Sequence, residues 1–245
     1  MSLACLDLTL PTPAENLACD EALLEQCAAG SADVAAGGVL RFWESATPFV
    51  VLGLANRVAE EVNQEACGAA GVPILRRCSG GGTVLQGPGC LSYALVLPVP
   101  EGGPLCTITG SNQFIMQRQA AALAAVLGEP VTVEGHTDLA VRGRKVSGNA
   151  QRRRRDWLLF HGTFLLGLDP ALMTLCLRPP PRQPAYRQGR GHQEFVTGLP
   201  VSIGAVKMAL VQAWEATAGV PGWPVDRVAD LVAQKYGQAG WNLCR

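Results

Sequence analysis

The sequence predicts a mixed α/β (α+β) fold, in which a mixed β-sheet is flanked by helices. Apolar residues make up 48% of the 245 residues and charged residues only 16%, a balance that favours a packed core over disorder. Short apolar and β-branched runs are interspersed with segments of helical periodicity. Because these segments follow no regular strand–helix–strand repeat, we expect a mixed sheet rather than a purely parallel one.

The first half of the chain begins with an amphipathic helix, because Leu17, Leu23, Leu24 and Cys27 recur at helical spacing between acidic residues. Strands, a helix ending at Gly71 and further strands are expected after it. The strands cover 38–44, 49–53, 72–77 and 90–98, and the helix covers 59–71. The strand at 72–77 leads directly into a glycine-rich segment.

The second half begins with a long helix over 110–128, for which Ser111 or Asn112 is the expected cap. A helix is expected to start at Asp169-Pro170, since aspartate is a favoured cap and proline suits the first turn. Arg142-Gly143 suits a hairpin turn. The expected strands cover 131–135, 138–141, 145–151 and 157–166, a long loop covers 178–203, and helices lie near 204–218 and 225–236.

The charge and cysteine content argue against several kinds of partner. The formal net charge is zero, so the chain has no strong electrostatic attraction to nucleic acid or to an anionic membrane. No apolar run approaches about 18 residues, and the N-terminus lacks the basic segment of a secretory signal. Nine cysteines without ligand-type spacing favour free thiols in a reducing compartment. We therefore expect a cytoplasmic protein with no nucleic-acid or membrane partner.

The segment RRCSGGGTVLQGPG places two arginines before three consecutive glycines, over residues 76–89. Glycines let the backbone approach a ligand closely and expose several N–H groups, and Arg77 adds a cation suited to phosphate or carboxylate. The segment is not a P-loop, because no Gly-Lys-Ser/Thr follows. An anion-binding loop and a simple bend between two strands are both open from these residues alone.

Lys145 is the only lysine in the first 206 residues of a chain with 17 arginines and three lysines. Strand alternation would place Lys145, Ser147 and Asn149 on one face, where they could clamp an acyl carboxylate or a phosphate. The alternative is an exposed lysine at a sheet edge. His161, in the apolar run FHGTFLL, is either a core histidine or a site residue.

Two further polar groups have weaker signals. The run of arginines at 152–155 is expected to be a solvated turn, with a docking patch for an acidic protein as the alternative. Tyr186, Arg187, Arg190 and His192 lie in the long loop, where they either decorate the surface or form a lid.

Three segments in order resemble the signature blocks of one family: RRCSGGGTVLQGPGCLSYAL, DLAVRGRKVSGNAQRR and FHGTFLL. They look like those of lipoate–protein ligases, within the biotin/lipoate ligase and octanoyltransferase superfamily. NLACDEALL and EFVTGL also fit, so the resemblance spans roughly residues 16–200. It implies a mixed α/β catalytic domain that converts lipoate and MgATP into lipoyl-adenylate. A lysine of an apo lipoyl carrier domain then receives the lipoyl group.

The resemblance also implies roles for residues at matching positions. Lys145 would be the catalytic residue, in contact with the acyl carbonyl and phosphate, and Asp138 would lie at the adenine or metal end. The implied substrate- and adenylate-binding residues are Arg77, Ser79, Gly80, Gly81, Gly82, Thr83, Asp138, Ser147, Gly148, Asn149, Ala150, His161, Gly162 and Thr163. ATP and Mg2+ are the implied cofactors and lipoate is the substrate, but no set of metal ligands follows from the match.

The chain departs from the family pattern at several positions. Ligases often carry His-Asp after the glycine block and an asparagine further on, where this chain has Gln86-Gly87 and Cys90. Many also have asparagine at the position of Thr137. Bacterial ligases commonly add a C-terminal accessory domain. We expect residues 1–245 to form a single catalytic domain without it, and a need for a separate accessory subunit is open.

Octanoyl transfer without ATP is the main alternative activity, and it requires a cysteine that carries the acyl group. One branch places this cysteine before the Asp/Lys block, where VTVEGHTDLAV has none, and another places it in a Pro-Cys-Gly turn that Cys176 lacks. We interpret Cys176 and Cys78 as packed thiols. A non-catalytic lipoyl-binding protein is a further alternative. Biotin transfer is disfavoured, because the Gly-Arg-Gly-Arg pattern of biotin ligases is absent.

Overall fold

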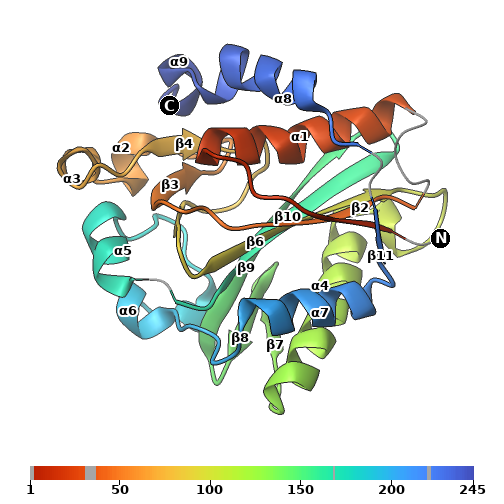
Figure 1. Cartoon of the computed structure of the whole chain (residues 1–245). Coiled ribbons are helices and arrows are strands. Elements are labelled where there is room, and N and C mark those ends of the chain that lie inside the picture. Colours follow the sequence, from red (N-terminus) through yellow and green to blue (C-terminus); the bar gives the residue numbers. More distant parts are fainter. Residues whose placement is uncertain (1–2, 31–36, 168, 220–221) are drawn as a thin grey trace.

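The computed structural model describes residues 3–30, 37–167, 169–219 and 222–245, and two β-sheets dominate it (Figure 1). The strands of the eight-stranded sheet are, in spatial order, β11 (Thr217–Ala218), β1 (Ala4–Asp7), β2 (Val39–Trp43), β6 (Cys90–Pro98), β10 (Trp157–Leu165), β9 (Arg144–Arg154), β8 (Asp138–Val141) and β7 (Thr132–Glu134). β1 pairs in parallel with β11 and β2, and the other neighbours pair antiparallel. The sheet is therefore mixed, as the sequence predicts.

A smaller sheet contains three strands in the order β4 (Ile74–Arg76), β3 (Phe49–Leu52) and β5 (Val84–Gln86). β3 pairs in parallel with β4 and antiparallel with β5. The sequence predicts β3 and β4 but not β5, whose three residues lie between glycine-rich stretches that favour turns. The glycine-rich segment connects β4 to β5, so this sheet holds both ends of that segment.

Helices cover both faces of the large sheet (Figure 1). On one face lie α4 (Ile108–Leu127) and α7 (Ile203–Ala213), and on the other lies α1 (Pro13–Ala29), with α8 (Val225–Leu231) packed against it. The shorter helices are α2 (Val58–Glu61), α3 (Gln64–Ala69), α5 (Pro170–Cys176), α6 (His192–Phe195) and α9 (Ala239–Asn242). Single turns also occur at η1 (Pro104–Cys106) and η2 (Ala185–Arg187), and Val232–Tyr236 (η3) is a π-helical turn.

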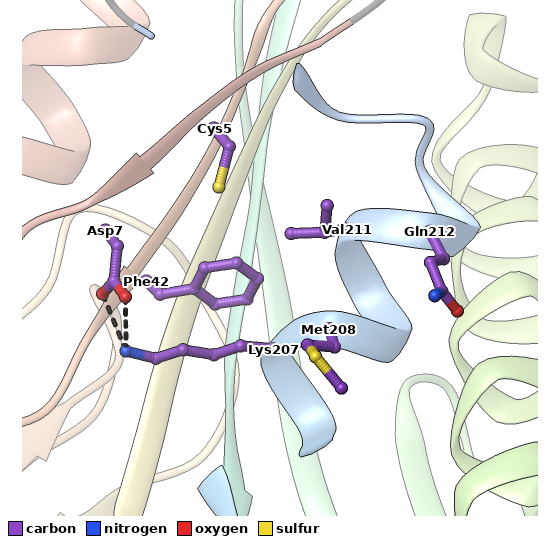
Figure 2. A pocket seen from close by; sticks show the side chains of 7 residues that line it. All are labelled: Cys5, Asp7, Phe42, Lys207, Met208, Val211 and Gln212. Atoms are coloured by element: carbon purple, nitrogen blue, oxygen red, sulfur yellow. Dashed lines mark hydrogen bonds and ion pairs between the residues drawn. The ribbon is translucent and has the colours of Figure 1, made fainter. Parts of the chain in front are cut away.

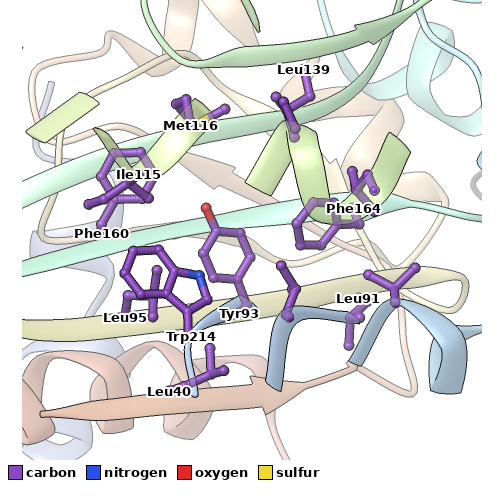
Figure 3. Packing of buried hydrophobic residues seen from close by; sticks show 14 of the residues in the cluster. Leu40, Leu91, Tyr93, Leu95, Ile115, Met116, Leu139, Phe160, Phe164 and Trp214 are labelled. Carbon is purple, nitrogen blue, oxygen red and sulfur yellow. The ribbon is translucent and has the colours of Figure 1, made fainter. Parts of the chain in front are cut away.

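Strand alternation divides the buried side chains between the two faces of the large sheet. Along β6, Leu91, Tyr93 and Leu95 pack against α4 and α7, whereas Ala94 and Val96 belong to the cluster beneath α1. Figure 3 shows the first of these clusters, in which the rings of Tyr93 and Phe164 stack with 5.1 Å between their centroids. Burial on both faces explains the continuous apolar run of this strand.

Both ends of α1 follow from its sequence. The Thr12 hydroxyl accepts a hydrogen bond from the Glu15 N–H, and the Glu15 carboxylate accepts one from the Thr12 N–H. This capping box is followed by Pro13 at the first helical position. The helix ends at Gly30, whose φ of 74° is a left-handed conformation that glycine adopts readily.

The helix predicted over 59–71 is wrong, because two short helices, α2 and α3, replace it. Between them, Val62 forms an isolated antiparallel bridge with Leu177, which requires extended backbone. The Asn63 side chain then accepts a hydrogen bond from the Ala66 N–H at 3.2 Å and starts the second helix. A tertiary contact thus interrupts a segment of good local helix propensity.

The cap predicted for α4 is also wrong. Thr107 caps this helix, since its hydroxyl accepts a hydrogen bond from the Gly110 N–H at 3.0 Å. Ser111 is buried inside the first turn and donates to the Thr107 carbonyl instead. The hairpin turn predicted at Arg142-Gly143 is confirmed, because both residues have the positive φ that a type I′ turn needs.

The arginine run at 152–155 is not the predicted solvated turn, because Arg152, Arg153 and Arg154 belong to β9 and only Arg155 starts the turn. Arg152 donates to the Cys78 carbonyl at 2.7 Å, and Arg153 donates to the Leu105 carbonyl at 2.7 Å. Arg154 pairs with Glu25 at 2.6 Å. These guanidinium groups therefore fasten neighbouring segments to the sheet.

Candidate functional site

A cavity with a volume of about 1120 Å³ collects most of the predicted site residues. Those that line it are Arg77, Gly80, Gly81, Gly82, Thr83, Asp138, Lys145, Gly148, Asn149, Ala150, His161, Gly162 and Thr163. Ser79 and Ser147 are buried outside its lining, where Ser79 contacts His161 and Ser147 contacts Asn149. Residues of the long loop after α5 complete the wall.

The floor of the cavity follows from strand register. His161 on β10 lies opposite Ala94 on β6 and Ala150 on β9. Two residues further along β10, Thr163 lies opposite Ser92 on β6 and Gly148 on β9. Residues directly opposite each other share a face of the sheet, so small and polar side chains form rows across this face, and all of these residues except Ala94 line the cavity. Such rows leave room for a ligand where larger side chains would fill the space.

The single-face arrangement predicted for Lys145, Ser147 and Asn149 is wrong, because a β-bulge interrupts β9. Leu139 pairs with Ser147 and its neighbour Ala140 pairs with Lys145, which leaves Val146 as one extra residue. A bulge shifts the alternation of side chains on its two sides. Lys145 therefore lies on the opposite face of β9 from Ser147 and Asn149. Lys145 and Asn149 both line the cavity, and Ser147 does not.

Two features hold the Lys145 ammonium in place. Its Nζ lies 2.8 Å from Asp138 Oδ1, and both side chains are largely covered, with exposures of 20% and 17%. A Cβ at Gly148 would stand 2.7 Å from the same Nζ, so only glycine leaves space for the lysine at that position. The lysine therefore lies across the strand that carries it, beside the cavity.

Tyr186 fastens the long loop to this ion pair. Its hydroxyl donates to Asp138 Oδ2 at 2.8 Å, and its ring packs against Phe195 with 5.0 Å between centroids. Burial and the nearby Asp138 carboxylate raise the pKa of Tyr186 far above its ordinary value, so the hydroxyl stays a donor. The sequence indicated that this loop could act at the site but gave no partner for Tyr186.

Arg77 stabilises the glycine loop from within. Its guanidinium donates to the Gly82 carbonyl at 2.8 Å and to the Gly80 carbonyl, while its Nε donates to the Ser79 hydroxyl. Burial lowers the pKa of Arg77 to about 10, so the side chain stays cationic at neutral pH. Gly81 has a φ of 85°, and a Cβ there would stand 2.7 Å from the Arg77 guanidinium. The three glycines are exposed to the cavity.

A buried chain of polar side chains connects the glycine loop to α1. His161 Nε2 lies 2.5 Å from the Ser79 hydroxyl, and its Nδ1 lies 3.2 Å from Asp20 Oδ2. Asp20 Oδ1 in turn accepts a hydrogen bond from Arg41 at 2.6 Å. His161 therefore lines the cavity and also lies within hydrogen-bonding distance of two buried side chains, Ser79 and Asp20. Asp20 and Arg41 were not predicted as site residues, although a charged residue inside an apolar run is a signal that marks each of them.

Two of the positions that depart from the family pattern, Gln86 and Thr137, also line the cavity. Gln86 Nε2 donates to Thr163 Oγ1 at 2.5 Å, and both residues line the cavity. The Thr137 hydroxyl donates to the Asn149 carbonyl at 2.7 Å, and the Asn149 amide donates to the Thr137 carbonyl. These side chains thus support one another across the site.

Neither cysteine considered as a nucleophile reaches the cavity. Cys78 is buried, and burial raises the pKa of its thiol to about 12, so it is protonated at neutral pH. Cys176 is fully buried in α5, where its carbonyl lies 3.9 Å from the Cys67 sulfur. None of the described residues that line the cavity is a cysteine.

Another, smaller cavity has a volume of about 220 Å³ and lies between α7 and the strands β1 and β2. Figure 2 shows that Phe42 and Val211 line it, and that Lys207 extends to Asp7 at its edge. The Lys207 ammonium contacts both Asp7 oxygens, at 2.7 and 2.8 Å. This lysine is therefore committed to an ion pair on the face of the sheet opposite the site.

The described part of the chain contains neither a metal-ligand cluster nor a helix that could span a membrane. Across residues 3–30, 37–167, 169–219 and 222–245, no group of three or more His, Cys, Asp or Glu side chains could hold a metal ion. Within the same ranges, no helix has the length and hydropathy needed to cross a bilayer.

The fold and the cavity define a catalytic domain of the lipoate ligase class. Residues 12–215 match the family described as the lipoyl protein ligase A/B catalytic domain, and the chain belongs to this family. A protein of Aeropyrum pernix provisionally named lipoate-protein ligase A is 32% identical over 215 residues, which cover 86% of this chain and 74% of the relative. Octanoyltransferase LipM of Symbiobacterium thermophilum is 30% identical, with coverage of 94% and 93%.

Solved structures share the fold across essentially the whole chain. A protein of T. acidophilum with bound lipoic acid has a TM-score of 0.83 at 21% identity, and the alignment covers 100% of both chains. A bi-partite lipoate protein ligase from Thermoplasma acidophilum, described with its E2 lipoyl domain, has a TM-score of 0.81 at 20% identity, covering 99% of this chain and 96% of that one. Lipoate-protein ligase A bound with ATP has a TM-score of 0.80 at 21% identity, with 99% coverage of each chain. The protein is thus an enzyme of the lipoate ligase and octanoyltransferase family.

Proposed function

We propose that the protein is a lipoate–protein ligase. It activates lipoate with MgATP to lipoyl-AMP and pyrophosphate, and it transfers the lipoyl group to a lysine of a lipoyl carrier domain. One observation carries the choice of ligase over transferase: the cavity contains the Lys145–Asp138 pair and an exposed glycine loop, whereas none of its described lining residues is a cysteine. A thioester route needs a reachable thiol, and an adenylate route does not.

In the first step, a lipoate carboxylate oxygen bonds to the α-phosphorus of ATP, and the bond from that phosphorus to the bridging oxygen breaks to release pyrophosphate. Negative charge on the carboxylate and phosphate oxygens is stabilised by the Lys145 ammonium, which Asp138 and Gly148 hold beside the cavity. The backbone of Gly80, Gly81 and Gly82 faces the same space and lets phosphate approach closely.

In the second step, the amine of the carrier lysine attacks the carbonyl carbon of the mixed anhydride, and AMP leaves. The Lys145 ammonium compensates the charge that develops on the carbonyl oxygen. The attacking amine loses its proton as the amide forms. Residues 1–245 act in this proposal as one catalytic domain.

The absence of a metal-ligand cluster among the described residues fits Mg2+ that arrives with ATP. Mg2+ commonly binds through one or two carboxylates together with substrate phosphates. Asp138 is the carboxylate beside Lys145 at the cavity and would be its protein ligand. When bound, the ion would neutralise phosphate charge.

Octanoyl transfer from an acyl-carrier thioester is the second candidate, because LipM relatives match over nearly their whole length. The two activities differ in donor. An apo lipoyl domain should gain the mass of a lipoyl group with lipoate and MgATP, but not when ATP is omitted. The protein would instead be a transferase if the lipoyl domain gained an octanoyl group from octanoyl-carrier protein without ATP and gained no lipoyl group from lipoate and MgATP.

A further inference from the structure

A row of residues on the other face of the large sheet lies beneath the site. Tyr93 on β6 lies opposite Gly162 on β10, and Gly162 lies opposite Asn149 on β9. Because side chains alternate along a strand, this row faces away from the neighbouring His161 and toward α4. Tyr93 is fully buried in the cluster that packs against α4 and α7. The row therefore connects the core to β9, the strand that carries Lys145.

Gly162 lets the Tyr93 hydroxyl reach Asn149 across an intervening strand. The hydroxyl donates to Asn149 Oδ1, although β6 and β9 are not neighbours in the sheet. A Cβ at Gly162 would collide with the Asn149 side chain, so glycine is needed between them. Burial raises the pKa of Tyr93 far above its ordinary value, so the hydroxyl keeps its proton. Asn149 is thereby fixed in orientation, with its amide oxygen toward Tyr93.

The Asn149 side chain in turn holds the residue that precedes Asp138. Its Nδ2 donates to the Thr137 carbonyl at 2.7 Å, and the Thr137 hydroxyl donates to the Asn149 carbonyl at 2.7 Å. The same Nδ2 also donates to the Ser147 hydroxyl at 3.2 Å. Both the oxygen and the NH2 group of Asn149 thus bond to protein. The two bonds with Thr137 fix the backbone where the turn after β7 ends and β8 begins.

Asp138 is the first residue of β8 and the counter-charge of Lys145. Its Oδ1 lies 2.8 Å from the Lys145 ammonium, and its Oδ2 accepts a hydrogen bond from Tyr186. A side chain that begins a strand directly after a turn takes its direction from the backbone before it. A shift of Thr137 would therefore move the Asp138 carboxylate away from Lys145, and small displacements of such groups are costly.

We propose that Thr137, Asn149 and Tyr93 are positioning residues that fix the Asp138 carboxylate beside Lys145 from the opposite face of the sheet. This inference rests on the proposed function, in which Asp138 would hold the Mg2+ that arrives with ATP. The hydrogen bonds from Tyr93 through Asn149 to Thr137 give all three residues this effect without contact with the nucleotide. Their loss should therefore weaken the use of MgATP and leave the use of lipoate unchanged.

Thr137→Val and Thr137→Ser form a matched pair of variants. Valine keeps the branched shape and loses the hydroxyl, whereas serine keeps the hydroxyl. In ligation of an apo lipoyl domain, Thr137→Val should raise KM for MgATP about 3- to 10-fold, the effect of one lost hydrogen bond, and leave KM for lipoate unchanged. Thr137→Ser should retain the wild-type KM for MgATP. Thr132→Val, which removes an exposed hydroxyl from β7, should do the same.

Tyr93→Phe removes only the hydroxyl that orients Asn149, so KM for MgATP should rise in this variant too. Calorimetric titration with MgATP, without lipoate and without turnover, should show weaker binding in Tyr93→Phe and Thr137→Val. If Tyr93→Phe does not fold, by circular dichroism, the two Thr137 variants alone decide. Equal KM values for MgATP in Thr137→Val and Thr137→Ser, or an increase shared by MgATP and lipoate, would overturn the inference.

Octanoyl transfer separates this inference from the proposed function. If the wild-type chain releases no pyrophosphate with lipoate and MgATP, the proposed function fails. The same variants are then compared in transfer from octanoyl-carrier protein to the lipoyl domain. Slower transfer by Thr137→Val, restored in Thr137→Ser, would still support positioning of the Asp138–Lys145 pair. Equal transfer by the two variants would overturn it.

Discussion

The position of the Lys145 side chain depends on a β-bulge and on two residues, Gly148 and Asp138, that do not adjoin it in the sequence. The bulge at Val146 changes the alternation, Gly148 leaves the space, and Asp138 on the next strand supplies the counter-charge. The rarity of lysine and the resemblance pointed to Lys145 from the sequence. The bulge was not predictable, because it arises from pairing between two strands rather than from the residues of one.

Lys145→Ala should reduce lipoyl transfer by about 100- to 1000-fold, the effect expected when one stabilising group for developing negative charge is removed. The fold should persist, since this side chain packs at a cavity wall rather than in the core. The rate of lipoyl-domain modification by mass spectrometry measures the effect. Lys207→Ala, which removes a lysine paired with Asp7 on the opposite face, should retain the wild-type rate. Comparable activity in both variants would remove Lys145 from the mechanism.

Gly148→Ala tests the space beneath the lysine without removing its charge. The added Cβ would stand 2.7 Å from Lys145 Nζ, so the ammonium must move away from Asp138. Because small displacements of a catalytic group are costly, turnover should fall about 10- to 100-fold. Gly68→Ala, in α3 with open space around it, is the matched control and should leave turnover unchanged. Unchanged turnover in Gly148→Ala, with the fold verified, would show that the lysine acts from another position.

At the scale of elements, the C-terminal segment completes the small sheet with side chains. The Arg76 N–H on the free edge of β4 donates to Asn242 Oδ1 at 3.0 Å, and the Arg76 carbonyl accepts from Trp241 Nε1 at 2.9 Å. Both partners lie at α9, and Asn242 also donates to the Tyr236 carbonyl. Two side chains thus occupy the place of a further strand, directly before the glycine loop.

Asn242→Ala should lower the free energy of unfolding by about 1–3 kcal/mol, because it leaves the buried Arg76 N–H without an acceptor. Chemical denaturation measures the loss. Gln238→Ala, also in the C-terminal segment, removes an exposed side chain and should change stability by no more than about 0.5 kcal/mol. Equal stability of the two variants would mean that the edge of β4 needs no side-chain partner.

The elements that the sequence predicted well have a strong local signal. α1 has a capping box and a terminal glycine, and β6 and β10 are long apolar strands. The elements that it predicted poorly depend on distant contacts. Val62 leaves the helical conformation to pair with Leu177, and the arginines of β9 stay in a strand because carbonyls and carboxylates from other segments accept their hydrogen bonds. Local propensity predicts neither a bridge to a distant residue nor hydrogen bonds to distant segments.

At the scale of the whole molecule, the cavity lies where segments from both sheets and the long loop meet. Three motifs in order were enough to predict which segments these are, and the structure places each motif at the cavity. The support around them could not be predicted in the same way. Asp20, Arg41 and Tyr186 act only through partners that are distant in sequence, such as His161 and Asp138.

Family membership leaves two activities that the same fold performs, ligation with ATP and octanoyl transfer without it. The cavity favours the first, since it contains a fixed lysine and an exposed glycine loop but no cysteine among its described lining residues. The buried Cys78 thiol, with a raised pKa of about 12, points in the same direction.

Pyrophosphate release by the purified chain with MgATP and lipoate, measured with and without an apo lipoyl domain, tests this account most directly. The account predicts lipoate-dependent release that rises when the lipoyl domain is added and that Lys145→Ala lowers by about 100- to 1000-fold. No lipoate-dependent release under either condition, combined with octanoylation of the lipoyl domain from an acyl-carrier thioester, would contradict it and establish a transferase.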